Sequence, residues 1–252
     1  MIDAPSGQAD KSLSMQRRKR IYKTVEVATV DAPVSGFAVM LDGRPARTPG
    51  KRPVICPSEA LASAVAKEWD AQEKEIHPET MPLSALVNTA LDGVSDRAEE
   101  VRAELVRYGG SDLLCYRAAD PEDLVARQAA AWQPVLNWFE GRYGIPLQVT
   151  SGLMPITQAP EALDALARVL AAIDPWPLTT LQVVTGAAGS VVLALALYEG
   201  HLGGAEVTAL SMLDETFQAE KWGEDAEAMA RRANVAADIL CAEQMLALIR
   251  QP

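Results

Sequence analysis

Hydrophobic and polar residues follow two different patterns along the chain. Between residues 20 and 56 hydrophobic residues alternate with polar ones or form short runs, and Asp42-Gly43 lies between two of these runs. Asp-Gly is typical of a two-residue β-hairpin, because both central positions of a type I′ turn need a positive φ angle. The segment therefore predicts a small antiparallel sheet. Such a sheet is not stable alone, so another element must cover one of its faces.

The expected cover is a helix that begins just after Pro57-Ser58. Leu61, Val65 and Trp69 recur at four-residue spacing and therefore share one helix face. The Ser58 hydroxyl can accept a free amide of the first turn. Helical periodicity then continues from about residue 81 almost to the end, with Gly or Pro between the segments.

These patterns together predict an α+β fold. A small antiparallel, β-rich N-terminal domain with its covering helix is expected at 20–80, and a larger, all-helical C-terminal domain at 81–252. A flexible tail is expected at 1–19, whose basic run at 17–20 is typical of a solvated lead-in to the first strand.

The segment 178–199 is the most apolar part of the chain. It predicts one buried helix, with Gly186, Ser190 and Ala194 repeating every four residues on one ridge. Small residues on a ridge let a second helix approach closely. The segment is too short and too polar to predict a membrane span, so no membrane insertion is expected.

Two further helices are expected near the C-terminus, at about 205–221 and 226–249. The second of them contains two apolar stripes. One stripe consists of Met229, Ala233, Ala236 and Leu240, and the other of Val235, Ile239, Leu246 and Ile249. Two stripes predict a helix that is buried on two sides.

The distribution of charged residues argues against one class of function, the binding of nucleic acids. The 252 residues carry a net charge of −11, but residues 1–56 carry +5 and the remainder −16. A body this acidic repels phosphate backbones, so no nucleic-acid partner is expected. The polar N-terminus resembles neither a secretory signal nor a transit peptide. Three widely separated cysteines without a CxxC pair favour a reducing compartment.

The sequence offers no recognisable catalytic motif. His77 and His201 are its only histidines, so the usual spacing of zinc ligands is missing, and no metal site is expected. The Gly-rich stretch at 186–190 lacks the lysine of a phosphate-binding loop and the third glycine of a dinucleotide fingerprint. No GxSxG motif occurs. We therefore expect no catalytic residues and no cofactor.

One dense acidic cluster, at 214–227, leaves three interpretations open. It could be a solvated face, or it could supply a general acid and a general base to an enzyme of unknown class. The third interpretation is a protein-binding surface, because aromatic residues edged by acids are typical of interface hot spots. On a helix, Glu215, Gln218 and Trp222 lie near one stripe, and Leu210, Asp214 and Phe217 near the adjacent one. Alternatively, Phe217 and Trp222 enter the core.

Several motifs, in order, resemble one chaperone family. They are Leu41-Asp-Gly-Arg-Pro-Ala-Arg-Thr-Pro-Gly50, Glu68-Trp69, Thr80-Met-Pro-Leu83, Asn88-Thr89-Ala90, Asp112-Leu-Leu-Cys-Tyr-Arg117, Trp132-Gln-Pro134 and Glu215-Thr-Phe-Gln-Ala-Glu-Lys-Trp-Gly223. With these motifs the chain, from about Arg20 to Ile249, resembles the chaperones that assemble the F1 part of ATP synthase by binding its alpha subunit.

The resemblance implies a helper protein and not an enzyme. Family members hold the new F1 alpha subunit until the beta subunit replaces them, need no bound nucleotide, and act in the bacterial cytoplasm or the mitochondrial matrix. Since no transit peptide is recognised, the bacterial cytoplasm is expected here. Where relatives have an acidic segment with a histidine after Trp-Gly, this chain reads Glu224-Asp-Ala-Glu-Ala-Met229.

The resemblance also implies a partner-binding site. It transfers to Glu215, Phe217, Gln218 and Trp222, to which Asp214 and Leu210 are added from the adjacent stripe. Glu68 and Trp69 complete the expected set. Trp69 lies on the apolar stripe of its helix, which favours a position in the core.

Overall fold

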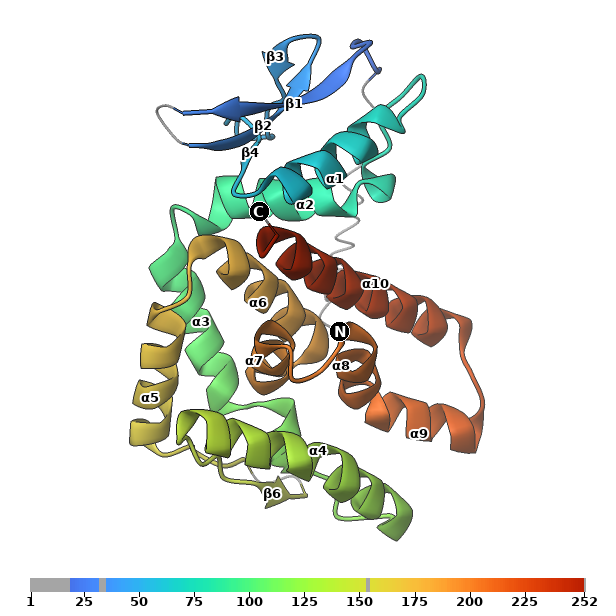
Figure 1. The fold of residues 1–252 in the computed structure, drawn as a ribbon. Helices are drawn as coiled ribbons and strands as arrows, with labels where there is room; N and C mark the ends of the chain where they lie inside the picture. Colours follow the sequence, from blue (N-terminus) through green and yellow to red (C-terminus); the bar gives the residue numbers. More distant parts are fainter. Residues whose placement is uncertain (1–18, 32–34, 153–154, 252) are drawn as a thin grey trace, which may run out of the picture.

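The N-terminal strands form an antiparallel sheet with β2 at its centre (Figure 1). In the computed structural model, which describes residues 19–31, 35–152 and 155–251, these strands are β1 (Val25–Val30), β2 (Gly36–Leu41), β3 (Arg44–Pro45) and β4 (Ile55–Cys56). β2 pairs with each of the other three. Asp42 and Gly43 have φ angles of 48° and 74°, which confirms the predicted hairpin turn.

Helix α1 (Glu59–Asp70) covers one face of this sheet, as predicted. Ser58 caps it, since its Oγ accepts the backbone N–H of Leu61 at 3.2 Å. Leu61 and Val65 are fully buried and pack into one cluster with Val39 and Cys56 of the strands. Burial of these side chains is what stabilises the small sheet.

A series of helices follows, with short connections. The α-helices are α2 (Pro82–Thr89), α3 (Ala98–Gly110), α4 (Glu122–Tyr143), α5 (Pro160–Ala171), α6 (Pro175–Ala188), α7 (Val191–Glu199), α8 (Gly204–Ser211), α9 (Leu213–Trp222) and α10 (Ala226–Ile249). Short single turns are η1 (Pro78–Thr80), η2 (Ala90–Val94) and η3 (Leu113–Cys115), and β5 (Tyr116–Arg117) pairs in parallel with β6 (Thr150–Ser151). The α+β fold class is confirmed.

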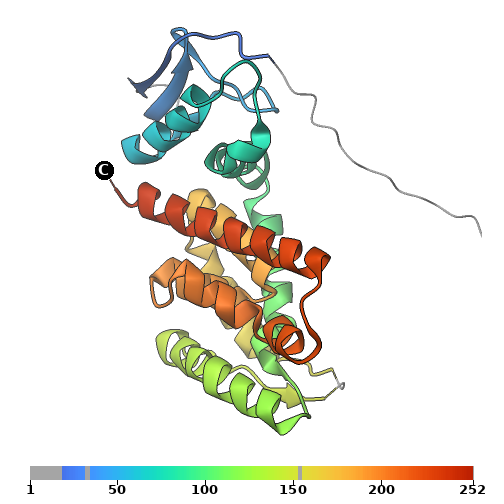
Figure 2. The ribbon, with the colours of Figure 1, turned by 90° about the vertical axis from the view of Figure 1, so that its right-hand side faces the viewer.

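Helix α10 joins the two parts of the fold. It packs along α6 and α8, and it also contacts α1 and α2 near its C-terminal end (Figures 1 and 2). Cys241 and Met245 belong to the same hydrophobic cluster as the sheet. In addition, the Ser58 hydroxyl donates a hydrogen bond of 2.7 Å to the carbonyl of Leu248. The N-terminal core therefore includes α10, while the domain boundary near residue 80 stays a prediction.

The single helix predicted at 178–199 is two helices, α6 and α7. Gly189 adopts a left-handed conformation with φ 69° and ends α6. Ser190 then caps α7 by accepting the N–H of Leu193 at 3.0 Å. Gly186, Ser190 and Ala194 consequently do not form one ridge. The predicted helix at 205–221 is likewise divided at Met212, into α8 and α9.

The prediction that α10 is buried on two sides is wrong for one stripe. Ile239 and Leu246 are buried, as expected for a stripe that faces α6. Met229 and Leu240 of the other stripe are 48 % and 46 % exposed. Figure 2 shows the reason, since no other described element lies over the outer side of α10 in that view.

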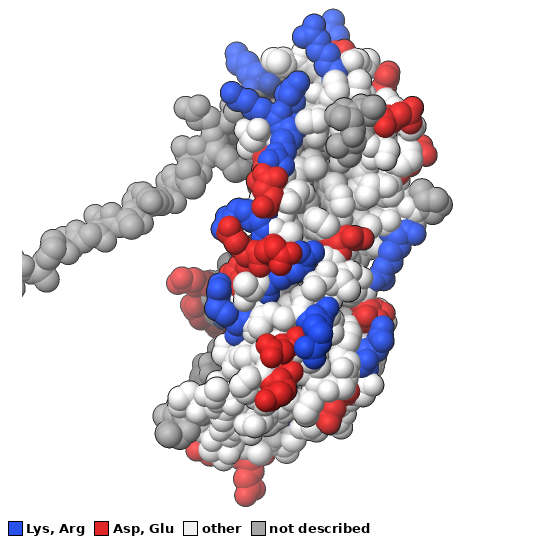
Figure 3. Space-filling model, turned by 90° about the vertical axis from the view of Figure 1, so that its left-hand side faces the viewer, with Lys and Arg blue, Asp and Glu red and all other residues white. Residues whose placement is uncertain are grey.

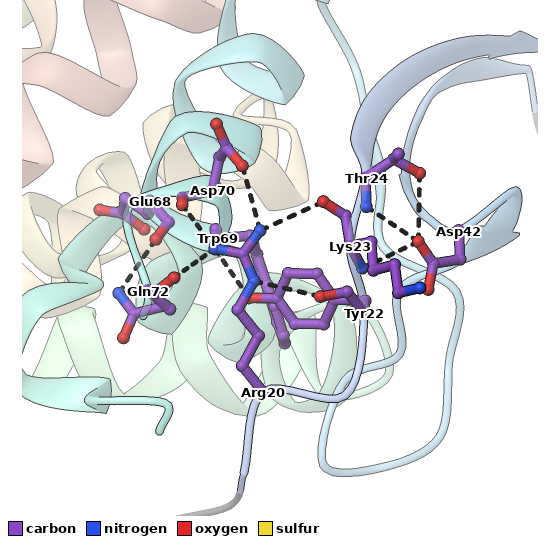
Figure 4. A network of polar contacts seen from close by, with 9 residues as sticks. All are labelled: Arg20, Tyr22, Lys23, Thr24, Asp42, Glu68, Trp69, Asp70 and Gln72. Carbon is purple, nitrogen blue, oxygen red and sulfur yellow. Dashed lines mark hydrogen bonds and ion pairs between the residues drawn. The ribbon is translucent and has the colours of Figure 1, made fainter. Parts of the chain in front are cut away.

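Arg20 has a structural role that was not predicted from the sequence, where it appeared as part of the basic run at 17–20. Its guanidinium donates hydrogen bonds to the carbonyls of Asp70, at 2.8 Å, and Gln72, at the C-terminal end of α1 (Figure 4). It also pairs with the Asp70 carboxylate at 3.2 Å, and its side chain is only 16 % exposed. A cation favours the C-terminal end of a helix. Arg20 thus holds the chain against α1. Of the tail predicted at 1–19, Lys19 is described and forms a β-bridge with Glu75, and residues 1–18 lie outside the described residues.

Among the helices that the structure describes, none is long and apolar enough to cross a membrane.

Candidate partner-binding surface

Glu215 and Trp222 lie on the side of α9 that faces α10, where both are accessible to solvent. The Glu215 carboxylate accepts a hydrogen bond of 2.8 Å from the Arg231 guanidinium of α10. Gln218, one turn further along α9, is exposed, and Trp222 at the end of α9 is 78 % exposed. These four residues line one shallow depression between the two helices, which we call the α9–α10 surface.

Asp214 and Leu210 attach α9 and α8 to α4, and Asp214 also lines a second depression together with Glu215, Gln218 and Arg231. The Asp214 carboxylate accepts a hydrogen bond of 2.7 Å from the buried Gln128 side chain. The indole N–H of Trp132 donates to the Leu210 carbonyl at 2.9 Å. Leu210 belongs to α8 and Asp214 to α9, so the predicted single stripe is interrupted at Met212, and both residues contact α4.

Phe217 lies on the buried side of α9. It is 2 % exposed, and the cationic groups of Arg127 and Lys221 each lie 5.2 Å from the centre of its ring. Cations over an aromatic face are attracted by its quadrupole. Of the two alternatives left open by the sequence, Phe217 thus enters the core and Trp222 does not.

Most carboxylates of the acidic cluster at 214–227 are engaged in ion pairs or in a helix cap, which does not favour the acid–base interpretation. Glu215, Glu220 and Glu224 each form an ion pair with an arginine, and Asp225 caps α10 at the N–H of Ala228. The hydrogen bond from Arg127 lowers the pKa of Glu220. A general acid needs the opposite shift, which requires burial or a neighbouring carboxylate.

Glu68 and Trp69 lie in the N-terminal part of the fold and not at the α9–α10 surface. The Glu68 carboxylate accepts the backbone N–H groups of Leu83 and Ser84, both at 2.8 Å, and therefore caps α2. Trp69 is half-buried against the sheet core, as predicted, and its ring centre lies 5.8 Å from that of Tyr22 in an edge-to-face arrangement (Figure 4). Both residues hold α1 to its neighbours.

Neither a metal site nor a catalytic histidine is apparent in the described part of the chain. No group of three or more His, Cys, Asp and Glu residues there could hold a metal ion. His201 stacks on Trp138 with ring centres 4.5 Å apart, and His77 lies 3.1 Å from Glu79. The three cysteines are free and buried.

Comparison with known proteins decides the family. The family model described as ATP12 chaperone protein matches residues 19–140. The crystal structure of Atp12 from Paracoccus denitrificans is 41 % identical and has a TM-score of 0.87, over 92 % of this chain and 99 % of that chain. The chain belongs to the ATP12 chaperone family. This confirms the family of F1 assembly chaperones that the sequence motifs resemble.

Two further proteins are similar to this chain, one of them known from a crystal structure. A protein of Agrobacterium tumefaciens is 45 % identical, with a TM-score of 0.85 over 92 % of this chain and 86 % of its own. The mitochondrial atp12 protein of Schizosaccharomyces pombe is 24 % identical over 230 residues, which cover 86 % of this chain and 78 % of the relative. The ATP12 fold therefore extends over both the sheet and the helices.

Sequence reasoning missed one buried group of this ATP12 chain, Asp112. Its carboxylate is completely buried and accepts hydrogen bonds from the Ser190 hydroxyl at 2.8 Å and from the N–H of Val192 at 3.1 Å. It also accepts the N–H of Leu114 at 3.0 Å. Burial raises the pKa of Asp112 to about 6, although these hydrogen bonds act in the opposite direction. Asp112 thus joins η3 to the start of α7.

The unequal charge distribution is visible on the molecule. On the face drawn in Figure 3, Lys and Arg gather over the upper end, which is formed by the strands, and the helical part below carries both signs. Residues 204–249, which include α8, α9 and α10, contain nine acidic and three basic residues. The lining of the α9–α10 surface itself holds two acids, Glu215 and Asp225, and two arginines, Arg231 and Arg232.

Proposed function

We propose that this chaperone binds the unassembled F1 alpha subunit and masks its subunit interface until the beta subunit takes its place. The observation that carries the proposal is the α9–α10 surface, where Trp222 is 78 % exposed beside the ion pair of Glu215 and Arg231. An exposed tryptophan next to an arginine and a carboxylate is the composition of an interface hot spot. Membership of the ATP12 chaperone family supports the same conclusion.

A small binding surface is sufficient for a chaperone that only covers the client's subunit interface for a time. An unassembled ring subunit exposes apolar area that normally lies in a subunit contact, and such patches aggregate. A chaperone has to cover this patch and then leave, so its affinity must be lower than that of the permanent neighbour. A small interface with charged residues at its edge meets both needs, because charge steers encounter more than it adds affinity.

The proposed place of action is the bacterial cytoplasm, or the mitochondrial matrix if the source is eukaryotic. Support comes from the relatives, which include the mitochondrial protein of Schizosaccharomyces pombe and the protein of Paracoccus denitrificans.

We expect Glu215→Lys to reduce capture of the F1 alpha subunit about fivefold, which corresponds to about 1 kcal/mol, and to leave the fold intact. Glu215 and its partner Arg231 are 40 % and 69 % exposed, so the lost ion pair contributes little to stability. The new lysine would lie beside Arg231 and reverse the local charge. Alpha subunit that co-purifies from a co-expression strain is measured, with circular dichroism as the test of folding.

Glu220→Lys is the matched control. It breaks an ion pair of similar exposure, 46 % for Arg127 and 48 % for Glu220, on the same helix but facing α4. Capture should therefore stay at the wild-type level. Equal capture by Glu215→Lys, Glu220→Lys and the wild type, with unchanged circular dichroism, would contradict the role given to Glu215.

A further inference from the structure

The outer face of α10 presents an uncharged strip to solvent. Eight exposed residues form this strip, which we call the α10 outer face: Ala226, Met229, Ala230, Ala233, Ala237, Leu240, Gln244 and Ala247. The exposed Glu227, Arg231, Asn234 and Asp238 also lie on α10 but outside the strip. The strip spans 226–247, or roughly 33 Å at 1.5 Å per residue. A solvent-facing side of a helix is normally polar, so an apolar strip of this length indicates a contact surface.

The strip continues into a groove beside α8. The groove has a volume of about 390 Å³ and is lined, among others, by Thr208, Ala209, Met212, Met229, Ala233 and Ala236. Leu240 extends the apolar lining to the start of α8, where its methyl group lies against Gly204. The groove also contains the ion pair of Glu224 and Arg232, and Arg232 lines the α9–α10 surface as well, so the two adjoin, although Glu215, Gln218 and Trp222 line only the latter.

The side chains are spaced for a helical partner. Met229, Ala233, Ala236 and Leu240 recur at intervals of four, three and four residues and therefore form one ridge along α10, against which a second helix can pack. The alanines between the two large side chains leave room for a second helix to approach closely. A helix of similar length could therefore lie along α10.

Charge identifies the kind of helix that fits. Residues 204–249 carry nine acidic and three basic side chains, and Lys221, Arg231 and Arg232 each already form an ion pair with an acid. The surroundings of the strip are therefore negative, which attracts a cationic partner. A second copy of this chain bound through the same face would bring two acidic regions together, and like charges across an interface cost several kcal/mol.

We infer that the α10 outer face and its groove bind a basic amphipathic helix of the F1 alpha subunit. The inference rests on the proposed function and adds a second contact to the α9–α10 surface. The apolar side of that helix covers Met229 and Leu240, and its basic residues face the acidic side chains along α8 and α10. Binding there keeps an aggregation-prone helix of the client out of water.

Two paired variants test this inference by co-expression with the F1 alpha subunit. Ala233→Lys with Ala237→Lys places two cations on the exposed strip, and Ala233→Glu with Ala237→Glu places two anions there. Lys and Glu are good helix formers, so α10 should stay folded. We expect the lysine pair to lower captured alpha subunit at least tenfold and the glutamate pair severalfold, because both charge the apolar strip but only lysine also repels a basic helix.

The matched control is Ala126→Lys with Ala130→Lys, two exposed alanines with the same spacing on α4. Capture by this control should equal that of the wild type. If both α10 pairs capture as much alpha subunit as the wild type, the inference is overturned and the proposed function stays intact. If the wild-type chain itself captures no alpha subunit, the proposed function is contradicted. Equal losses for the two pairs overturn the basic character of the partner helix.

Two further measurements on the same preparations test whether something other than the alpha subunit covers the α10 outer face. A wild-type dimer in size-exclusion chromatography that the lysine pair converts to a monomer would assign the strip to a second copy of this chain. Stronger capture after deletion of residues 1–18 would assign it to this chain's own N-terminal segment. Either result overturns the inference, and a monomer whose capture does not depend on residues 1–18 supports it.

Discussion

Asp112→Ala is expected to lower the free energy of unfolding by about 3 kcal/mol or more, because each buried donor left unsatisfied costs about 1–3 kcal/mol. The carboxylate is completely buried and accepts hydrogen bonds from Ser190, Leu114 and Val192. Alanine would leave these donors without an acceptor and would also open a small cavity at the start of α7. Urea unfolding followed by circular dichroism measures the change.

Asp112→Asn is the control for this loss. Its side-chain oxygen keeps one acceptor at nearly the same place, so we expect a distinctly smaller decrease than for alanine. A free energy of unfolding for Asp112→Ala within about 0.5 kcal/mol of the wild-type value, the range of ordinary surface substitutions, would show that the Asp112 network does not stabilise the fold.

The pH dependence of stability gives a second test of the same residue. Burial raises the pKa of Asp112 to about 6, above the value near 4 that is usual for an unfolded chain. The folded protein therefore binds the proton more tightly than the unfolded chain. The resulting stabilisation is complete below about pH 4 and is lost as the pH rises through 6. Relative to Asp112→Asn, the wild type should gain up to about 3 kcal/mol from pH 7 to pH 4; parallel curves would contradict the raised pKa.

Trp222→Ala should reduce capture of the F1 alpha subunit about 30-fold, which corresponds to about 2 kcal/mol, the size typical of a tryptophan hot spot. Trp222 is 78 % exposed, so its removal should change stability by less than about 0.5 kcal/mol. A large loss of capture without a loss of stability is expected for a residue that binds the partner and does not hold the fold together. Co-purified alpha subunit and the urea midpoint are measured on the same preparation.

Ile21→Ala is the matched control for Trp222→Ala. Ile21 is an equally prominent apolar side chain, at 90 % exposure, but it precedes β1 in the N-terminal part of the fold. Its truncation should leave capture unchanged. If Ile21→Ala and Trp222→Ala lowered capture alike, general surface hydrophobicity and not the α9–α10 surface would account for binding.

Local patterns predicted the sheet, the cover helix and most helices because their causes are local. The turn at Asp42-Gly43 needs two positive φ angles, and Ser58 caps a helix that begins at the next residue. The break between α6 and α7 was also encoded locally. Gly189 ends one helix and Ser190 begins the next, but the continuous apolar composition on both sides suggested one helix.

The candidate site depends on contacts that lie far apart in the sequence. Asp214 meets Gln128 across 86 positions, and Asp112 meets Ser190 across 78, so no short pattern could assign either as structural. Helical periodicity placed Glu215, Gln218 and Trp222 on one stripe correctly. It could not tell which stripe faces solvent, because that depends on which helices pack against α9 and α10.

The most direct test of the central claim mixes the purified chain with the F1 alpha subunit as the latter refolds. Light scattering reports aggregation of the alpha subunit, and size-exclusion chromatography reports the complex. We predict that aggregation is suppressed near one-to-one stoichiometry, that a one-to-one complex forms, and that added beta subunit releases the chaperone. Undiminished scattering in an excess of the chain, or full suppression by a small fraction of an equivalent, would contradict binding as the basis of its action.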